Sequence, residues 1–468
     1  MKRPDMVADP VGSALFRLLL PMIPGTLSIV LFNLADTFFV GRLGALQLAA
    51  MSFSFPVVLV SGGLSMGLGI GTTAHISRAL GAGDRELAKR ISSQAHLLAF
   101  LIVLTLAVAG LLTIEPLFRA LGADSSTLPL IRTYMTIWYS GLPFVILPMI
   151  GMNVLQATGD TKIPGLVLTL SVILNIGLDP LLIFGIGPFP ELGIAGAALA
   201  TVISRASSFI IVGTVIIRRE KLLTLRIGGI RDVFHEWGEI LFVGIPAAAT
   251  NILLPVSQGI ITRLVSEYGN TAVAGFGAAT RVESFALVLV IALSMILTPF
   301  VGRNLGAGRI DRVRLAHRRG SEFSLVWGVV VLGVFLAAGR PIASIFNDNQ
   351  EVVSVTSLYL RIVAVSYGIL GIVNVTSAAL NGLRKPLSAA AVAAVRLFAL
   401  YVPLALLGRA LAGLQGLFWG AAAGNILGGV VAFFWFRHQR LEKGEEQPEA
   451  PVESTSLVAA ETGQSGSR

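Results

Sequence analysis

The chain has 468 residues, of which 54% are hydrophobic and only 13% charged, with a mean hydropathy of +0.80. Soluble proteins carry about 25% charged residues, and a soluble chain of this length needs them to cover its core. The composition therefore excludes a soluble globular enzyme and predicts a helical membrane protein. The chain also lacks cysteine, which excludes disulfides, thiolate nucleophiles and cysteine metal sites.

Apolar stretches long enough to cross the ~30 Å hydrocarbon layer recur along most of the chain. The first stretch has no small-residue cleavage site, so we expect it to remain in the protein. The fold class that follows is an all-α membrane protein with twelve transmembrane helices. The predicted spans are Ala14–Val40, Leu46–Ala74, Ile91–Ile114, Leu128–Ala157, Ile163–Ile186, Gly193–Ile217, Ile240–Val265, Thr271–Val301, Ser321–Ala338, Val352–Leu380, Leu387–Gly408 and Leu414–Phe436.

The net charge of +9 comes from short basic loops and not from a continuous basic surface, so no nucleic-acid partner is expected. Six arginines lie on one side of the predicted membrane, and the other side collects most of the remaining Lys and Arg. The positive-inside rule therefore places both termini in the cytoplasm of a cell whose inner membrane holds the protein. The loops on the sparsely charged side contain Arg42, Arg119, Arg132, Arg263, Arg340 and Arg409.

An internal repeat divides the chain into two halves. Leu80–Gly83 (LGAG) recurs as Leu305–Gly308, an offset of 225 residues, and later matches drift to 223 and 220. Six spans per repeat give both halves the same topology, with a central cavity between two pseudo-symmetric six-helix lobes. The expected divisions are a cytoplasmic segment at 1–13, an N-lobe at 14–217, a linker at 218–239, a C-lobe at 240–436 and a disordered tail at 437–468.

Two carboxylates fall deep inside predicted spans of the first half. Charged groups at mid-membrane cost about 2.5–3.5 kcal/mol on insertion scales, so their presence indicates function. Asp36 lies in the first span, and Asn175 and Asp179 share one helix face in the fifth. Pro180 leaves a backbone carbonyl unpaired one turn back, and Thr201 adds a hydroxyl group. This set predicts a site that binds H⁺ or Na⁺.

The repeat supplies an internal control for this site, because positions needed only for packing should be polar in both halves. Each of the four polar positions is apolar in the second half. This asymmetry favours an ion-coupling role over a structural one. Asp36, Asn175, Asp179 and Thr201 correspond to Ile261, Phe398, Val402 and Ala421.

Other candidates carry weaker signals. We expect substrate contacts from Asn33, Asn153, Arg281 and Glu283, which lie within or near apolar spans. Ser65 stands in a Gly-x-Ser-x-Gly pattern, but a nucleophile elbow needs a strand–turn–helix, and this pattern lies in an apolar helix. A membrane-embedded serine hydrolase is therefore a poor alternative, and the chain is not expected to be an enzyme or to hold a cofactor.

The chain resembles the multidrug and toxic compound extrusion (MATE) transporters, in the DinF-like branch, over Leu15–Phe436. The resemblance rests on the order and spacing of several short motifs. It implies twelve helices in two lobes and export of organic cations or amphipathic drugs in exchange for H⁺ or Na⁺. The motifs are Asp36–Gly44, Leu80–Gly83, Leu305–Gly308, Leu155–Asp160, Asn175–Pro180 and Gly193–Thr201.

In the DinF-like branch the first-lobe aspartates carry the coupling, and Asp36, Asn175, Asp179 and Thr201 match that pattern. Other branches place acids in the seventh and tenth helices, but Gly244–Ser266 and Val352–Leu380 contain none, so no cation site is expected in the second lobe. We expect a monomer surrounded by membrane lipid that exports by alternating access. The alternative is a flippase for a lipid-linked oligosaccharide from the same superfamily, which would need a strongly basic cavity.

Overall fold

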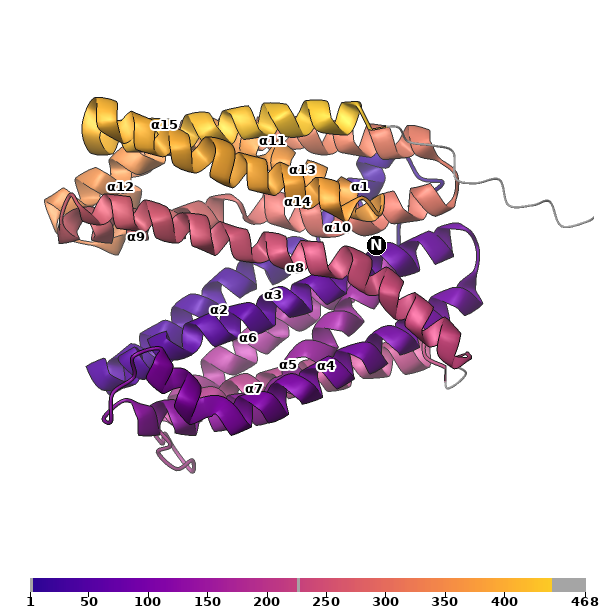
Figure 1. Ribbon diagram of the computed structural model, residues 1–468, viewed down its shortest axis with the longest axis horizontal. Helices are drawn as coiled ribbons and strands as arrows, with labels where there is room; N and C mark the ends of the chain where they lie inside the picture. Colours follow the sequence, from indigo (N-terminus) through magenta and orange to yellow (C-terminus); the bar gives the residue numbers. More distant parts are fainter. Residues whose placement is uncertain (1–2, 225–227, 440–468) are drawn as a thin grey trace, which may run out of the picture.

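The computed structural model describes residues 3–224 and 228–439, and every regular element within those ranges is a helix. Figure 1 shows two bundles side by side, with α2–α7 in one and α8–α15 in the other. We call them the N-lobe and the C-lobe. Helices α1 to α7 with the π-helical turn η1 span Val11–Leu19, Met22–Leu43, Ala45–Gly81, Arg85–Ala120, Leu128–Ala157, Lys162–Ile183, Ile194–Thr214 and Val215–Glu220.

The second half repeats this arrangement with more interruptions. The α8 to α11 helices span Ile230–Ser266, Asn270–Ala286, Val288–Gly306 and Ile310–Phe346. The remaining elements are α12 (Gln350–Val363), η2 (Ala364–Ser366), α13 (Tyr367–Gly382), α14 (Pro386–Ala394), η3 (Val395–Tyr401) and α15 (Val402–Arg437). Within α15 the backbone leaves helical geometry at Ala412 and Gly413, where the eleventh span ends and the twelfth begins. The described helices therefore make the twelve predicted crossings.

Hydropathy located the apolar middle of each helix and missed the polar ends. The seventh span begins at Ile230 and not at Ile240, because α8 continues out of the hydrocarbon layer to a start where Asp232 accepts a hydrogen bond from the Gly229 N–H. The linker predicted at 218–239 is correspondingly shorter. The third span begins at Arg85, where Asp84 caps α4 by accepting from the Leu87 N–H.

The predicted eighth span is two helices and not one. The chain breaks between α9 and α10 at Leu287, and the Trp327 indole donates a 2.8 Å hydrogen bond to the Ala286 carbonyl at the break. This bond satisfies a carbonyl that a continuous helix would have paired. The first span is also interrupted, after α1, and α1 packs on α10 and α11 of the C-lobe.

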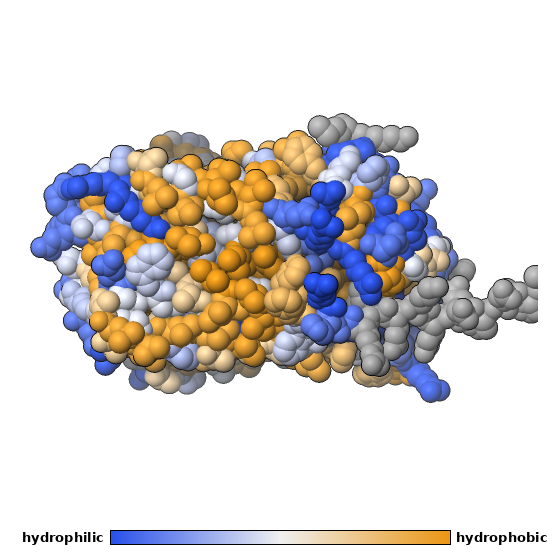
Figure 2. All heavy atoms as spheres, turned by 90° about the horizontal axis from the view of Figure 1, so that it is seen from above, coloured by the Kyte–Doolittle hydropathy of each residue, from blue (hydrophilic) through white to orange (hydrophobic). Residues whose placement is uncertain are grey.

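A broad apolar area covers the middle of the face seen in Figure 2, and hydrophilic residues gather toward its two ends. Eleven continuous helical stretches of the described chain are long and apolar enough to cross a membrane, and the last of these contains two spans. Large apolar side chains that are exposed on these helices include Leu112, Ile173, Ile210, Ile245, Val326 and Val329. The protein is therefore a multi-pass membrane protein.

The lobes contact each other through α3, α8 and α10. At one end, which we call the basic side because it carries most of the loop arginines, the twin Leu-Gly-Ala-Gly motifs meet. A Cβ atom on Gly81 would lie 2.1 Å from the Arg303 carbonyl oxygen, and one on Gly306 would lie 2.1 Å from the Arg78 carbonyl oxygen. Only glycine permits this approach, so the structure has its basic side closed.

Candidate functional site

The N-lobe buries two carboxylates on neighbouring helices. Asp36 on α2 is 6% exposed, and Asp179 on α6 is fully buried. Helices α2 and α6 pack together, and the two carboxylates lie close enough for their charges to interact. The structure therefore brings together the two acids that the sequence placed in separate spans.

Asn175 lies beside these two carboxylates, and several oxygens of the three side chains have no hydrogen-bond partner. The Asn175 amide donates a 3.3 Å hydrogen bond to Asp179 Oδ1 across one helical turn. Asp36 Oδ1, Asp179 Oδ2 and Asn175 Oδ1 are buried without a hydrogen-bond partner. Buried oxygens without partners are costly unless a proton or a cation satisfies them, and these three fit either one. Thr201 is buried on α7, which packs on α6.

Tyr134 is a further member of this centre that sequence reasoning missed. It lies on α5, is 5% exposed, and is near enough to interact electrostatically with both Asp36 and Asp179. The repeat carries a signal that could have found it. The offset of 225 residues that aligns Leu155 with Leu380 also aligns Tyr134 with Tyr359, so both lobes keep a tyrosine at this position.

The predicted substrate contacts lie in different places. Asn153 is engaged at both ends of its amide, since it accepts from Thr73 on α3 at 3.0 Å and donates to the Met149 carbonyl at 2.8 Å. Arg281 is exposed on α9, whereas Glu283 is half-buried and turned into the C-lobe. The side chain of Asn33 lies outside the described residues.

The C-lobe contains a second polar centre around Glu283. The Tyr359 hydroxyl donates a 2.7 Å hydrogen bond to its carboxylate. Tyr367 on α13 and Arg396 and Tyr401 on η3 interact electrostatically with the same carboxylate. The C-lobe therefore has a half-buried acid, which lies on the helix after the seventh span and not on the seventh or tenth helix.

A third polar cluster joins the N-terminal segment (residues 3–10) to the basic side of both lobes. Arg3 contacts Asp160 at 2.7 Å and Glu220 at 2.6 Å, and Arg219 pairs with the same two acids. Burial raises the pKa of Asp160, but the Ile163 N–H, Arg3 and Arg219 outweigh it and hold that pKa below its ordinary value.

The same segment is held by the C-lobe. Asn304 on α10 donates to the Met6 carbonyl at 2.9 Å, and Arg312 on α11 donates to the carbonyls of Met6 and Asp9 at 3.1 and 2.6 Å. One side-chain contact also connects the lobes directly at this end, between His75 on α3 and Glu236 on α8. Arg384 contacts Glu239 within the C-lobe beside it. The closed basic side is therefore fixed by polar contacts as well as by glycine packing.

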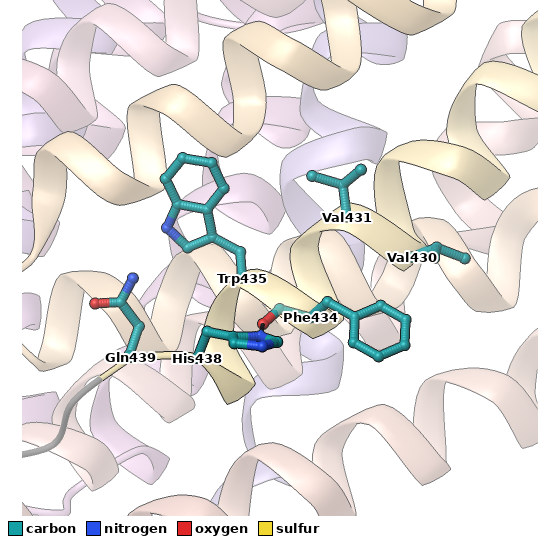
Figure 3. Close-up of a pocket in the computed structure, with 6 residues that line it drawn as sticks. All are labelled: Val430, Val431, Phe434, Trp435, His438 and Gln439. Atoms are coloured by element: carbon teal, nitrogen blue, oxygen red, sulfur yellow. Dashed lines mark hydrogen bonds between the residues drawn. The ribbon is translucent and has the colours of Figure 1, made fainter.

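A surface groove at the end of α15 belongs to none of these centres. Its lining residues all come from one helix end (Figure 3): Val430, Val431, Phe434, Trp435, His438 and Gln439. The described residues contain no group of three or more His, Cys, Asp or Glu side chains able to hold a metal ion. A Na⁺ ion would therefore depend on the two carboxylates with amide, hydroxyl and carbonyl oxygens.

Twelve spans in two repeated lobes, with ionisable groups buried inside the lobes, define a secondary-transporter fold. A sequence model of the MatE family matches residues 21–181 and 246–407. The chain belongs to the MATE family of transporters, as the motifs predicted. It is accordingly a transporter and not an enzyme, and Ser65 donates its hydroxyl to the Ser61 carbonyl inside α3.

Relatives cover nearly the whole chain. The FAD transporter of Shewanella oneidensis is 38% identical over 432 residues, covering 92% of this chain and 96% of that protein. The multidrug export protein MepA of Staphylococcus aureus is 27% identical, covering 88% and 90%. A mutant of the Vibrio cholerae MATE transporter VcmN superposes with a TM-score of 0.88 at 34% identity, covering 92% and 98%. An outward-facing multidrug resistance MATE transporter gives 0.88 at 25% identity, covering 93% and 97%.

Proposed function

We propose that the protein is an antiporter that exports organic cations or amphipathic compounds across the cell's inner membrane in exchange for H⁺ or Na⁺. One observation carries this proposal: Asp36 and Asp179 are buried within electrostatic range of each other, and each has an oxygen without a partner. Two such carboxylates repel each other when both are charged, so the pair attracts a proton or a cation.

The coupling ion would act by neutralising the N-lobe centre. The ligands available to Na⁺ are Asp36, Asp179 and Asn175, with Thr201 and the Ile176 carbonyl, which Pro180 leaves without its helical N–H partner. A proton would instead be shared by the two carboxylates. Either ion removes repulsion between α2 and α6 and lets these helices repack, and a cationic substrate would be released in the same step.

The direction of export follows from the charge asymmetry of the loops. We place the basic side in the cytoplasm, with both termini, because loop arginines and lysines favour that side. The closed basic side then makes this an outward-facing arrangement, in which bound substrate would leave the cell.

A dinucleotide such as FAD is a second candidate substrate. It is favoured by the 38% identity to a protein named FAD transporter, which is matched over 96% of its length. Arg205 on α7 and Arg396 on η3 would supply positive charge inside the spans, and the Arg205 guanidinium stands 5.2 Å from the Phe32 ring centroid. The two candidates differ in charge, so one transport assay separates them.

The experiment is uptake into everted proteoliposomes of ethidium, an organic cation, and of FAD, under separate H⁺ and Na⁺ gradients. Wild type should accumulate one or both compounds under one gradient, and Asp36→Asn should not. Asp348→Asn is the matched control, because it makes the same change in the exposed turn between α11 and α12. Gradient-driven uptake that survives in Asp36→Asn would refute the coupling site, and uptake under neither gradient would refute the antiporter.

A further inference from the structure

The C-lobe centre has donors that its own residues leave unused. Arg396 Nε and the Tyr367 hydroxyl are buried and have no hydrogen-bond partner. The other end of the guanidinium is fixed, since Arg396 Nη1 donates 3.0 Å to Asn425 Oδ1 and Asn425 donates in turn to the Ser366 hydroxyl at 3.4 Å. The Arg396 guanidinium is thus held in one orientation, and its Nε–H has no acceptor.

The charge of Arg396 is balanced only at a distance. Glu283 interacts with Arg396 electrostatically, but no ion pair within 4.0 Å joins them among the described residues, and the carboxylate instead accepts the Tyr359 hydroxyl. Both charged side chains are half-buried, whereas Tyr359 and Tyr367 are 3% and 1% exposed. Glu283 and Arg396 are therefore the less enclosed part of this polar centre, although Arg396 Nε itself is buried.

The repeat shows that this centre is not inherited from the shared scaffold. By the offsets that align the lobes, Glu283, Tyr367 and Arg396 correspond to Val58, Leu142 and Ile173 in the N-lobe. Only Tyr359 has a polar counterpart, Tyr134. Packing of the repeated fold therefore does not require these groups, and buried charge that packing does not require indicates a ligand.

We propose that Arg396 and Tyr367 form a subsite for a phosphate group of the transported compound, with Glu283 as the resident counter-ion that the phosphate displaces. The inference rests on the proposed export function and deepens it by naming a substrate group. Arg396 and Tyr367 both interact electrostatically with Glu283. A guanidinium with a free Nε–H and a hydroxyl around the same carboxylate match the acceptor oxygens of a phosphate. Glu283 keeps the site neutral when it is empty and disfavours compounds without an anionic group.

The test is equilibrium binding of riboflavin, FMN and FAD to the purified full-length protein, followed by flavin fluorescence. Riboflavin is FMN without its phosphate group. The ratio of the riboflavin Kd to the FMN Kd therefore measures how much the phosphate contributes to affinity. Wild type should bind FMN at least about tenfold more tightly than riboflavin, as charge-assisted hydrogen bonds predict. The ratio should fall to about one in Arg396→Gln, while Glu283→Gln should raise FMN affinity without raising riboflavin affinity.

Two further variants separate recognition from damage to the fold. Arg396→Lys keeps the charge and should retain part of the preference. Arg409→Gln is the matched control, since it removes a half-buried arginine of the same lobe that pairs with Glu267 and not with Glu283. A ratio unchanged in Arg396→Gln, equal loss of all three flavins, or no FMN binding by wild type would overturn the subsite. Ethidium transport by the same preparation reports separately on the antiporter.

Discussion

The two lobes are copies of one helical frame that place their buried acids differently. The N-lobe pairs Asp36 with Asp179 and gives them no basic partner within the described residues. The C-lobe surrounds a single acid, Glu283, with Arg396 and tyrosines. An acid pair without a base responds to small cations, whereas an acid beside a base is already neutralised. On the proposed function, this difference would let one frame separate ion coupling from substrate recognition.

The largest expected effect follows from the unpaired N-lobe acids. Asp179→Asn should leave Asp36 without the carboxylate that raises its attraction for an ion, and gradient-driven uptake should fall about 5–150-fold, the range of ordinary coupling energies. Glu283→Gln should change which compounds are carried and keep the response to the gradient. Uptake by both variants under H⁺ and Na⁺ gradients tests this. Loss of gradient dependence in Glu283→Gln would show that both lobes take part in ion coupling, which would contradict this contrast.

A second experiment tests the close contact that the twin glycines, Gly81 and Gly306, make between the lobes. Gly81→Val and Gly306→Val should have the same effect, since each side chain would strike a carbonyl of the other lobe, at a cost of about 1–3 kcal/mol to the closed basic side. Both should shift the protein toward the state with the opposite side closed.

The chain has no cysteine, so spin labels at Ser125→Cys and Asp348→Cys report the distance across that opposite side directly. Both glycine variants should shorten the distance. Gly62→Val is the control, because it lies in the same helix as Gly81 with open space around it. An effect from only one of the twin glycines would show that the lobe contact is not symmetric.

A third prediction contrasts the stability of the two acid centres. Glu283→Ala should destabilise the protein by about 1–3 kcal/mol, because it leaves the Tyr359 hydroxyl without its acceptor and Arg396 without the charge that interacts with it. Asp36→Ala should destabilise it less, since it relieves repulsion and breaks no ion pair. Thermal unfolding of the two variants in detergent measures the difference. The double variant Glu283→Ala/Arg396→Ala should recover part of the loss, and equal destabilisation by the two single variants would contradict the contrast.

The sequence predicted the twelve crossings and the two lobes because hydropathy and the internal repeat indicate the same arrangement independently. Span length sets the crossings, and Leu80–Gly83 with its twin sets the two lobes. The breaks inside spans were not predictable in this way. The α9–α10 break depends on an indole of α11 that reaches the Ala286 carbonyl, and such a contact exists only after the bundle has packed.

The candidate sites were predicted unevenly for a similar reason. Asp36 and Asp179 stood out because charge is rare inside a span, and their proximity needed only the packing of α2 on α6. Tyr134 is chemically ordinary in an apolar helix, so its place beside them emerged from the structure. Glu283 was singled out with Arg281, but the helix directs the two side chains differently, and the true neighbours of Glu283 come from η3 and α12.

The smallest expected effect concerns the N-terminal segment (residues 3–10). The N-terminal segment contacts both lobes, and the pKa of Asp160 lies below its ordinary value because the Ile163 N–H, Arg3 and Arg219 outweigh its burial. A lowered pKa means that ionised Asp160 stabilises the folded state above its ordinary pKa, near 4, and that this stabilisation is lost as the pH falls further. Asp160→Asn should therefore cost about 1 kcal/mol at pH 7, as partly exposed pairs do, and less at pH 3.

Proteolysis of the N-terminal segment at the two pH values, in wild type and Asp160→Asn, measures this contribution. The variant should be cut faster than wild type at pH 7 in a short pulse after equilibration, and the difference between the two should be smaller after equilibration at pH 3. Asp124→Asn is the control: the Thr127 N–H and hydroxyl and Ser126 lower the pKa of Asp124 to about 2, but it is exposed in the turn between α4 and α5, far along the chain from the segment. If Asp160→Asn and wild type were cut equally at pH 7, ionised Asp160 would contribute nothing to holding the segment, which would then depend on Glu220 of the N-lobe and on Asn304 and Arg312 of the C-lobe.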